Sequence, residues 1–186
     1  MIRILFVCTG NVHRSVLAER LMAARLPPSS RLVPESAGTQ AWHRSGMDHS
    51  TRAVLEELGG DGSGFVSRPL TPQLVAGAGL VLGLAREHRE AAVRLAPRAM
   101  RRCFTLMEFL RLAAGAGELH RPTGGFGALV TSAAALRGVV PPVPPAEDDI
   151  ADPWGRPRQD LHHRALQIDG AVSGLARLWQ DSGAIA

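Results

Sequence analysis

Lysine and tyrosine are absent from this sequence of 186 residues, and cysteine occurs only twice, as Cys8 and Cys103. Two cysteines cannot form a disulfide framework or a four-ligand zinc site. The longest apolar stretch, around 74–85, is interrupted by glycines and is too short to span a bilayer. The first residues also lack the pattern of a signal peptide. These absences predict a cytoplasmic protein with no membrane partner.

Because lysine is absent, all 21 basic residues are arginines, and the net charge is +4. The arginines are scattered, and most lie near an acidic residue, as in the stretch 86–90. A basic stripe with interleaved aromatic residues would favour nucleic-acid binding, but aromatic residues make up only 4% of the chain. The composition therefore predicts no nucleic-acid partner. With 45% apolar and 20% charged residues, it is typical of a globular protein.

Short apolar runs alternate with segments of helical periodicity along most of the chain. The runs predict buried strands at 2–7, 32–39, 80–84 and 102–106. The periodic segments predict helices at 15–26, 50–58, 72–78, 86–95 and 159–179. This alternation predicts an α/β fold, with a four-stranded parallel sheet and helices on both faces. The length suits a single domain, residues 1–186.

The segment 113–149 does not follow this alternation, because it is rich in Gly, Ala and Pro. We predict one helix within it, at about 126–136. The proline-rich run 139–145 predicts an extended and fairly stiff connector. We expect this segment to be an insertion or connector that shapes a cleft, binds a partner or is filler.

The stretch CTGNVHRS, residues 8–15, follows the first predicted strand and begins the first predicted helix. The backbone N–H groups of such a loop converge on its centre, and the helix N-terminus adds partial positive charge, so the loop favours a phosphate-like dianion. Nearby dipoles and Arg14 favour the thiolate of Cys8, which is the nucleophilic form. The planar fork of Arg14 can bind two phosphoryl oxygens. The hydroxyl of Ser15 can donate to the Cys8 sulfur.

Two further residues suit this loop. Gly10 allows the backbone to approach a ligand closely, and Asn11 tolerates a left-handed conformation. A cysteine followed six residues later by an arginine is a weak signal alone, because arginine fills 21 of 186 positions. The Gly-Asn pair, the serine and the flanking strand and helix make the signal specific. Neither a Walker loop nor a dinucleotide-binding loop is present.

Asp152-Pro153-Trp154 is the candidate acid loop. A phosphatase requires a proton donor for the leaving oxygen, and Asp152 can supply it. Trp154 offers a flat apolar wall beside this carboxyl group. The alternative interpretation of the segment is a simple turn before the last helix, with a packed tryptophan.

Three segments occur in a characteristic order, namely 8–15, 36–39 and 152–154. With them the chain resembles the low-molecular-weight protein tyrosine phosphatase family, as a bacterial, actinobacterial-like member, over about residues 2–110 and 147–179. The family loop is C-x-G-N-x-x-R-S, and every fixed position of it is matched here. The resemblance implies a four-stranded parallel sheet and a phosphocysteine intermediate that forms without a metal or other cofactor.

The resemblance also implies a role for each matched catalytic residue. Cys8 is the implied nucleophile, and Arg14 the implied clamp on the phosphate and the transition state. Ser15 would bond to the thiolate. Asp152 would act as the general acid, and then as the general base for water attack on the phosphocysteine.

The implied binding residues surround these catalytic groups. Backbone N–H groups would bind phosphate from Thr9, Gly10, Asn11, Val12, His13 and Arg14. Asn11 and Ser36 would support the loop through a hydrogen bond between them. The implied contacts to the substrate ring are Val12, Trp42 and Trp154.

The chain departs from the family pattern at several positions. His13 replaces a second cysteine that protects the nucleophile in many members; it could aid the thiolate electrostatically or lie on the surface. The absence of tyrosine excludes regulation by phosphorylation after the Asp-Pro pair. An apolar residue at Val12 suits phosphotyrosine, whereas phosphoarginine-preferring members carry threonine there.

The expected function is dephosphorylation of phosphotyrosine in proteins. The alternatives are a small phosphomonoester or phosphoarginine as substrate, a silent anion-binding module, and arsenate-reductase-like redox chemistry, for which only Cys103 is left as a second cysteine. The oligomeric state is not predicted. We expect surface positions for His43, His49, His88, Asp148 and Asp149, and a packing role for Trp179.

Overall fold

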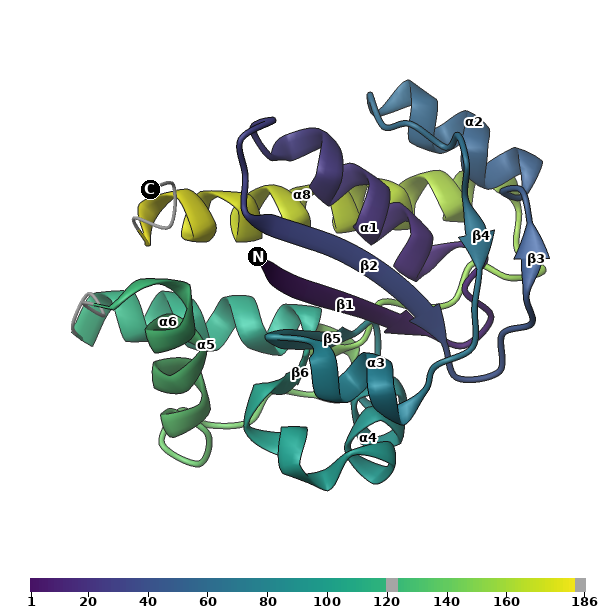
Figure 1. Cartoon of the computed structure of the whole chain (residues 1–186). Helices are drawn as coiled ribbons and strands as arrows, with labels where there is room; N and C mark the ends of the chain where they lie inside the picture. Colours follow the sequence, from purple (N-terminus) through teal and green to yellow (C-terminus); the bar gives the residue numbers. More distant parts are fainter. Residues whose placement is uncertain (120–123, 183–186) are drawn as a thin grey trace.

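The computed structural model describes residues 1–119 and 124–182. Its central sheet has the strand order β2-β1-β5-β6, and all neighbouring strands are parallel (Figure 1). The strands are β1 (Ile2–Cys8), β2 (Leu32–Gly38), β5 (Leu80–Gly83) and β6 (Cys103–Thr105). The predicted α/β class and the four-stranded parallel sheet are confirmed.

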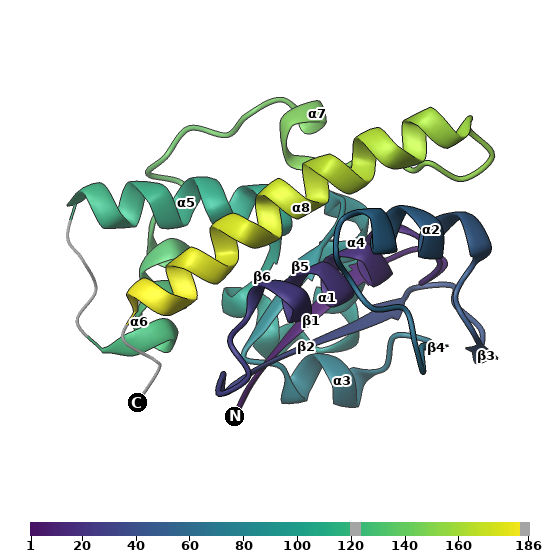
Figure 2. The same cartoon turned by 90° about the horizontal axis from the view of Figure 1, so that it is seen from above.

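The side chains of β1 alternate between two core layers, because successive residues of a strand point to opposite faces of the sheet. Ile4, Phe6 and Cys8 face the larger layer, whereas Leu5 and Val7 face the smaller one. The larger layer is covered by α1 (Arg14–Arg25), α5 (Leu106–Leu119), α6 (Gly125–Ala135) and α8 (Arg158–Asp181). The smaller layer is covered by α3 (Pro72–Gly77), α4 (Arg86–Leu95) and the 3-10 helix η1 (Pro97–Arg102). Figure 2 shows the long helix α8 crossing beside α1 and α5.

The predicted helices and strands have the right type, and most boundaries differ by one residue. The strand predicted at 102–106 is shorter at both ends, because Arg102 completes η1 and Leu106 begins α5. The helix predicted at 50–58 is α2 (His49–Glu57). Two short strands were not predicted, β3 (Arg44–Ser45) and β4 (Val66–Ser67), which form an antiparallel pair beside the main sheet.

The segment 113–149 is more helical than predicted. Helix α5 continues to Leu119, so the connector does not begin at Ala113, and a short helix α7 (Pro145–Asp148) follows the proline run. The predicted helix at 126–136 is present as α6. Residues 120–123 of the predicted insertion lie outside the described residues.

This segment packs on the core. The ring of Phe126 in α6 lies 5.2 Å from that of Trp179, which is buried as expected. Just after α6, the Nε of Arg137 donates to Glu108 at 3.0 Å, and its guanidinium lies 3.8 Å from the centre of the Phe104 ring. These contacts hold the end of α6 against β6 and α5.

Within residues 1–119 and 124–182, no helix is both long and apolar enough to cross a membrane.

Candidate active site

The carboxyl ends of the parallel strands lie at one edge of the sheet. There β1 lies between β2 and β5. The connection after β1 leads to its neighbour on one side, and the connection after β2 leads to the strands on the other side, so the strand order reverses at β1. Such switch points are where open α/β sheets bind ligands. Strand β1 ends at Cys8, the loop 9–13 follows, and α1 begins at Arg14. The sequence motif therefore occupies the position in this fold that favours a binding site.

Cys8 is buried, and its sulfur lies 2.9 Å from the hydroxyl oxygen of Ser15. Asn11 has a φ of 51°, the left-handed conformation that turns the loop. Among the described residues, no backbone or side-chain acceptor is bound to the N–H groups of 9–13. These donors are therefore available to an anion, as the loop pattern predicts.

The amide group of Asn11 determines the direction of the hydrogen bonds behind the loop. Its Nδ2 donates to Ser15 at 2.9 Å and to Ser36 at 2.8 Å, and its Oδ1 accepts from the N–H of Arg68 at 2.9 Å. Ser36 in turn donates to Glu19. Since Ser15 accepts from Asn11, its own hydrogen is free to bond to the Cys8 sulfur and stabilise the thiolate.

Gly38, at the end of β2, lies directly against this loop. A Cβ atom at this position would lie 2.5 Å from the carbonyl oxygen of Thr9 and 2.8 Å from the nitrogen of Asn11. Both neighbours are backbone atoms, so a larger residue would displace the loop. This close approach explains why the segment 36–39 accompanies the cysteine loop.

Arg14 joins the loop to the acid loop. Its guanidinium is almost completely buried and donates to the carbonyl of Ile150 at 3.0 Å, to Asp152 at 2.6 Å and to the hydroxyl of Thr9 at 3.4 Å. The other carboxylate oxygen of Asp152 accepts from the N–H of Trp154 at 3.1 Å. The structure thus places the predicted clamp and the predicted acid in direct contact.

A cavity of about 320 Å³ opens above Cys8. Its walls include all three predicted ring contacts, Val12, Trp42 and Trp154, together with Gln40, which was not predicted. The tryptophans are 85% and 68% exposed, so they rise from the rim as two apolar surfaces. Exposed tryptophans that flank a cavity are suited to contact a flat group.

His13 also lines the cavity and does not lie on the open surface. Its Nδ1 is 2.5 Å from the hydroxyl of Thr51, and its ring lies 5.6 Å from that of Trp154. Burial lowers the pKa of His13, while the carboxylates of Asp48 and Asp152 act in the opposite direction. His13 therefore connects the loop to α2 and to the acid loop.

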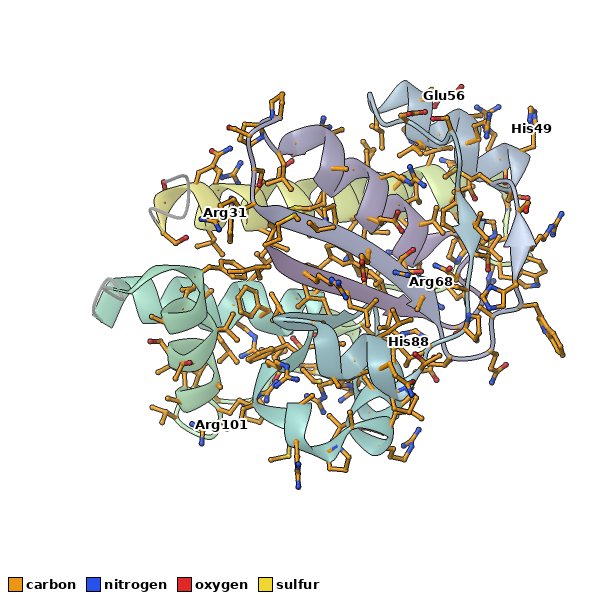
Figure 3. All side chains as sticks on the ribbon, viewed as in Figure 1. Arg31, His49, Glu56, Arg68, His88 and Arg101 are labelled. Atoms are coloured by element: carbon orange, nitrogen blue, oxygen red, sulfur yellow. The ribbon has the colours of Figure 1, made fainter. Side chains whose placement is uncertain are left out.

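The surface position predicted for His88 is wrong, because its side chain is only 1% exposed. It lies in the first turn of α4, where its Nε2 is 3.0 Å from the hydroxyl oxygen of Thr9. Figure 3 labels it near the carboxyl end of β1. Burial, aided by the nearby Arg14, lowers the pKa of His88 to about 4.

Asp148 and Asp149, for which we predicted surface positions, each bind a partner within the protein. Asp148 forms an ion pair with Arg111 at 3.2 Å, and Asp149 accepts from the backbone N–H of Arg86 at 2.8 Å. Asp149 thereby satisfies a free N–H at the start of α4. Both carboxylates are thus engaged along the chain that leads to Asp152.

We expect acid to destabilise this protein through His88. The pKa of its folded form, about 4, lies below the ordinary value of 6.5, so the unfolded chain binds the proton more tightly. The contribution of His88 to the free energy of unfolding is then fully present above pH 6.5. It is lost, by up to about 3 kcal/mol, as the pH decreases to about 4. Thermal or urea unfolding of His88→Gln should show a flatter pH dependence in this range. His163→Gln, an exposed control, should follow the wild type; equal curves for all three proteins would contradict the assignment.

Cys103 is not placed to react with Cys8. Both cysteines are free, but Cys103 belongs to the smaller core layer, whereas Cys8 faces the larger one. Burial raises the pKa of Cys103 to about 11, which keeps its thiol protonated. In the parts of the chain that the structure describes, no cluster of three or more His, Cys, Asp or Glu residues is arranged to hold a metal ion.

Known proteins resemble this chain in both sequence and fold. A Streptomyces coelicolor low molecular weight protein-tyrosine-phosphatase is 39% identical over 99 residues, which cover 51% of this chain and 60% of that protein. This chain therefore matches about three fifths of the length of that relative. A protein-arginine-phosphatase of Geobacillus stearothermophilus is 32% identical over 123 residues, 66% of this chain and 80% of that protein.

Solved structures extend the comparison to nearly the whole chain. The YwlE arginine phosphatase from Geobacillus stearothermophilus superposes with a TM-score of 0.72 and 27% identity, covering 97% of this chain and 94% of that one. The profile described as "Low molecular weight phosphotyrosine protein phosphatase" matches residues 3–131, more than half of this chain. The chain belongs to the low molecular weight phosphotyrosine protein phosphatase family.

Proposed function

We propose that this protein hydrolyses phosphomonoesters, and above all phosphotyrosine in proteins, through a covalent phosphocysteine and without a metal ion. The observation that carries this proposal is the contact of Arg14 with Asp152 at 2.6 Å, beside a Cys8 sulfur that lies 2.9 Å from Ser15. Nucleophile, clamp and acid thus share one cavity. This is the set of groups that a two-step phosphoryl transfer requires.

In the first step, the thiolate of Cys8 attacks phosphorus while the bond from phosphorus to the substrate oxygen breaks. Arg14 and the loop N–H groups bind the three other phosphoryl oxygens. Asp152, protonated, gives its proton to the departing oxygen, so the alcohol or phenol leaves neutral. The products of this step are the free alcohol and a phosphorylated Cys8.

Before this step, Arg14 must exchange partners. Its Nη2 is bound to Asp152 in the structure, and the side chain of Asp152 is 45% exposed at the rim. A phosphoryl dianion that pairs with Arg14 takes the place of this carboxylate, which is then free to turn toward the leaving oxygen. The bonds from Arg14 to Ile150 and Thr9 keep the guanidinium in place during the exchange.

In the second step, Asp152 takes a proton from a water molecule, and the oxygen of that water attacks phosphorus. The bond from phosphorus to sulfur breaks and releases inorganic phosphate. The Ser15 hydroxyl stabilises the leaving thiolate through the same hydrogen bond that activates it in the first step. The cycle consumes one water and restores Cys8. Because Cys8 must remain reduced, we propose that the protein acts in the cytoplasm.

The walls of the cavity favour an aromatic phosphoester. Val12, Trp42 and Trp154 present apolar surface to a group bound above Cys8. Phosphoarginine is the second candidate substrate, because relatives in sequence and structure are named arginine phosphatases. A guanidinium would place polar N–H groups against Val12, which offers no hydrogen-bond acceptor.

Initial rates on matched peptides that carry phosphotyrosine or phosphoarginine test this preference. We expect kcat/KM to favour phosphotyrosine by at least about 10-fold, and Val12→Thr to reduce this ratio, since one well-placed polar contact changes selectivity by this order. Val12→Ile, which keeps an apolar wall, is the control. A preference for phosphoarginine in the wild type would reject the substrate assignment. Activity on neither peptide but on a small aryl phosphate would point to a small phosphoester.

Asp152→Asn should slow hydrolysis of a phosphotyrosine peptide by about 10²-fold or more, because the substituted amide cannot supply a proton. Aryl phosphates with acidic leaving groups need little protonation, so we expect them to lose much less rate. A series of aryl phosphates with graded leaving-group acidity measures this difference. Asp160→Asn, an exposed change in the first turn of α8, should leave all rates unchanged. An equal loss across the series would show that Asp152 is not the acid.

A further inference from the structure

The hydroxyl of Thr9 has two nitrogen neighbours, and together they determine the direction of its hydrogen. The Nη2 of Arg14 lies 3.4 Å from Thr9 Oγ1, and the Nε2 of His88 lies 3.0 Å from it. A guanidinium can only donate. Thr9 therefore accepts a hydrogen bond from Arg14, and the remaining question is which partner donates in the contact with His88.

The surroundings of His88 place its hydrogen on Nε2. This nitrogen is also 3.3 Å from a carboxylate oxygen of Glu87, which attracts an N–H. The other ring nitrogen, Nδ1, is buried and has no partner among the described residues. A buried N–H without an acceptor is rarer than a buried acceptor without a donor. His88 is therefore a neutral ring that donates from Nε2 to Thr9, and its pKa of about 4 keeps it neutral near pH 7.

A threonine hydroxyl has one hydrogen to donate and two lone pairs to accept with. In this arrangement both lone pairs of Thr9 are occupied, one by Arg14 and one by His88. Its hydrogen must point away from both, and Thr9 lines the cavity above Cys8. We infer that the Thr9 side chain donates a hydrogen bond to the bound phosphoryl group, and that His88 is a positioning residue that holds this hydroxyl in its donating orientation.

The inference deepens the proposed function, on which it rests. A phosphoryl group that pairs with Arg14 lies beside Thr9, because Arg14 contacts both Thr9 and Asp152. The loop then supplies a side-chain donor in addition to its backbone N–H groups. One hydrogen bond to a charged oxygen changes affinity or rate by about 10-fold to 100-fold.

The test is a double-mutant cycle on Thr9 and His88. Thr9→Val keeps the shape of the side chain but removes the hydroxyl, and Thr9→Ser retains it. His88→Gln can place its amide nitrogen at the position of Nε2, whereas His88→Asn reaches only the position of Nδ1. The readouts are kcat/KM for an aryl phosphate and the dissociation constant of inorganic phosphate from calorimetry. Thermal unfolding establishes that each variant is folded.

We expect Thr9→Val and His88→Asn each to weaken phosphate binding and lower kcat/KM by about 10-fold or more. Thr9→Ser and His88→Gln, which each keep a donor at the required position, should recover most of the affinity and rate that Thr9→Val and His88→Asn lose. The double variant, Thr9→Val with His88→Asn, should be no worse than Thr9→Val alone, because His88 acts through the hydroxyl.

Two results would overturn the inference. Thr9→Val with wild-type phosphate affinity and kcat/KM would show that the hydroxyl donates nothing to the ligand. Effects of Thr9→Val and His88→Asn that multiply in the double variant would show that His88 does not act through Thr9. Failure of the proposed function can be distinguished from failure of this inference. If the wild type binds phosphate but hydrolyses nothing, the proposed function is wrong, and the double-mutant cycle can still be measured by calorimetry. A wild type that does not bind phosphate rejects both.

Discussion

Cys8→Ser should lower kcat for every phosphoester substrate by at least about 10⁴-fold, because a serine hydroxyl in this loop is not ionised near neutral pH. The change replaces one buried atom, and the hydroxyl of Ser15 can still bond to the new oxygen at that position. We therefore expect the variant to fold and to bind inorganic phosphate. Initial rates measure the loss, with a chelator to suppress contaminating metal-dependent phosphatases and a reductant to keep the wild-type thiol reduced.

Cys103→Ala is the matched control, since it removes the other free thiol from the opposite core layer. We expect its kcat/KM to stay within about 3-fold of the wild type, with some loss of thermal stability from the small cavity. If Cys8→Ser kept a tenth or more of the activity, the covalent mechanism would be wrong. If Cys103→Ala abolished turnover of the reduced enzyme, a redox function would need reconsideration.

Arg14→Lys should lower kcat/KM by about 10³-fold although the positive charge is retained. The guanidinium holds Ile150, Thr9 and Asp152 at the same time, with distances of 3.0, 3.4 and 2.6 Å. A lysine ammonium is a single point that cannot reproduce this fork or bind two phosphoryl oxygens in one plane. The loss should appear in kcat more than in KM, because the transition state is bound most tightly by the fork.

Arg86→Lys provides the comparison within the same region. Arg86 pairs with Asp149 at the partly exposed start of α4, outside the cavity above Cys8. We expect it to change kcat/KM by less than about 3-fold, as is usual for exposed ion pairs. A similar loss in Arg14→Lys and Arg86→Lys would indicate a general electrostatic effect and would remove the specific role of the Arg14 fork.

The sheet was predictable because its strands are continuous buried runs that end in turn residues. The pair β3 and β4 was not, since each strand has two residues, and their pairing of Arg44 with Ser67 depends on the fold. Helix α5 lacked a helical signal for a related reason. It is rich in apolar residues, packs against α6 and α8, and contains glycines such as Gly115 that weaken helical propensity.

The site was predictable where its residues are adjacent in sequence. The loop from Cys8 to Ser15 contains the nucleophile, the clamp and the thiolate donor in eight positions, and its pattern is specific. His88 was missed because it lies among arginines and glutamates that predict a solvated helix. Only its position in the first turn after a buried strand, at the edge of the sheet that holds Cys8, could have indicated it.

The most direct test of the mechanism is to trap the phosphorylated enzyme. Asp152→Asn is mixed with an aryl phosphate that has a good leaving group, quenched in acid within milliseconds to seconds, and digested for mass spectrometry. We expect a phosphoryl group on Cys8, because the first step proceeds without the acid while water attack is slowed. A phosphoryl group on another residue, such as Ser15, or substrate turnover with no phosphorylated enzyme at any time would contradict the proposed mechanism.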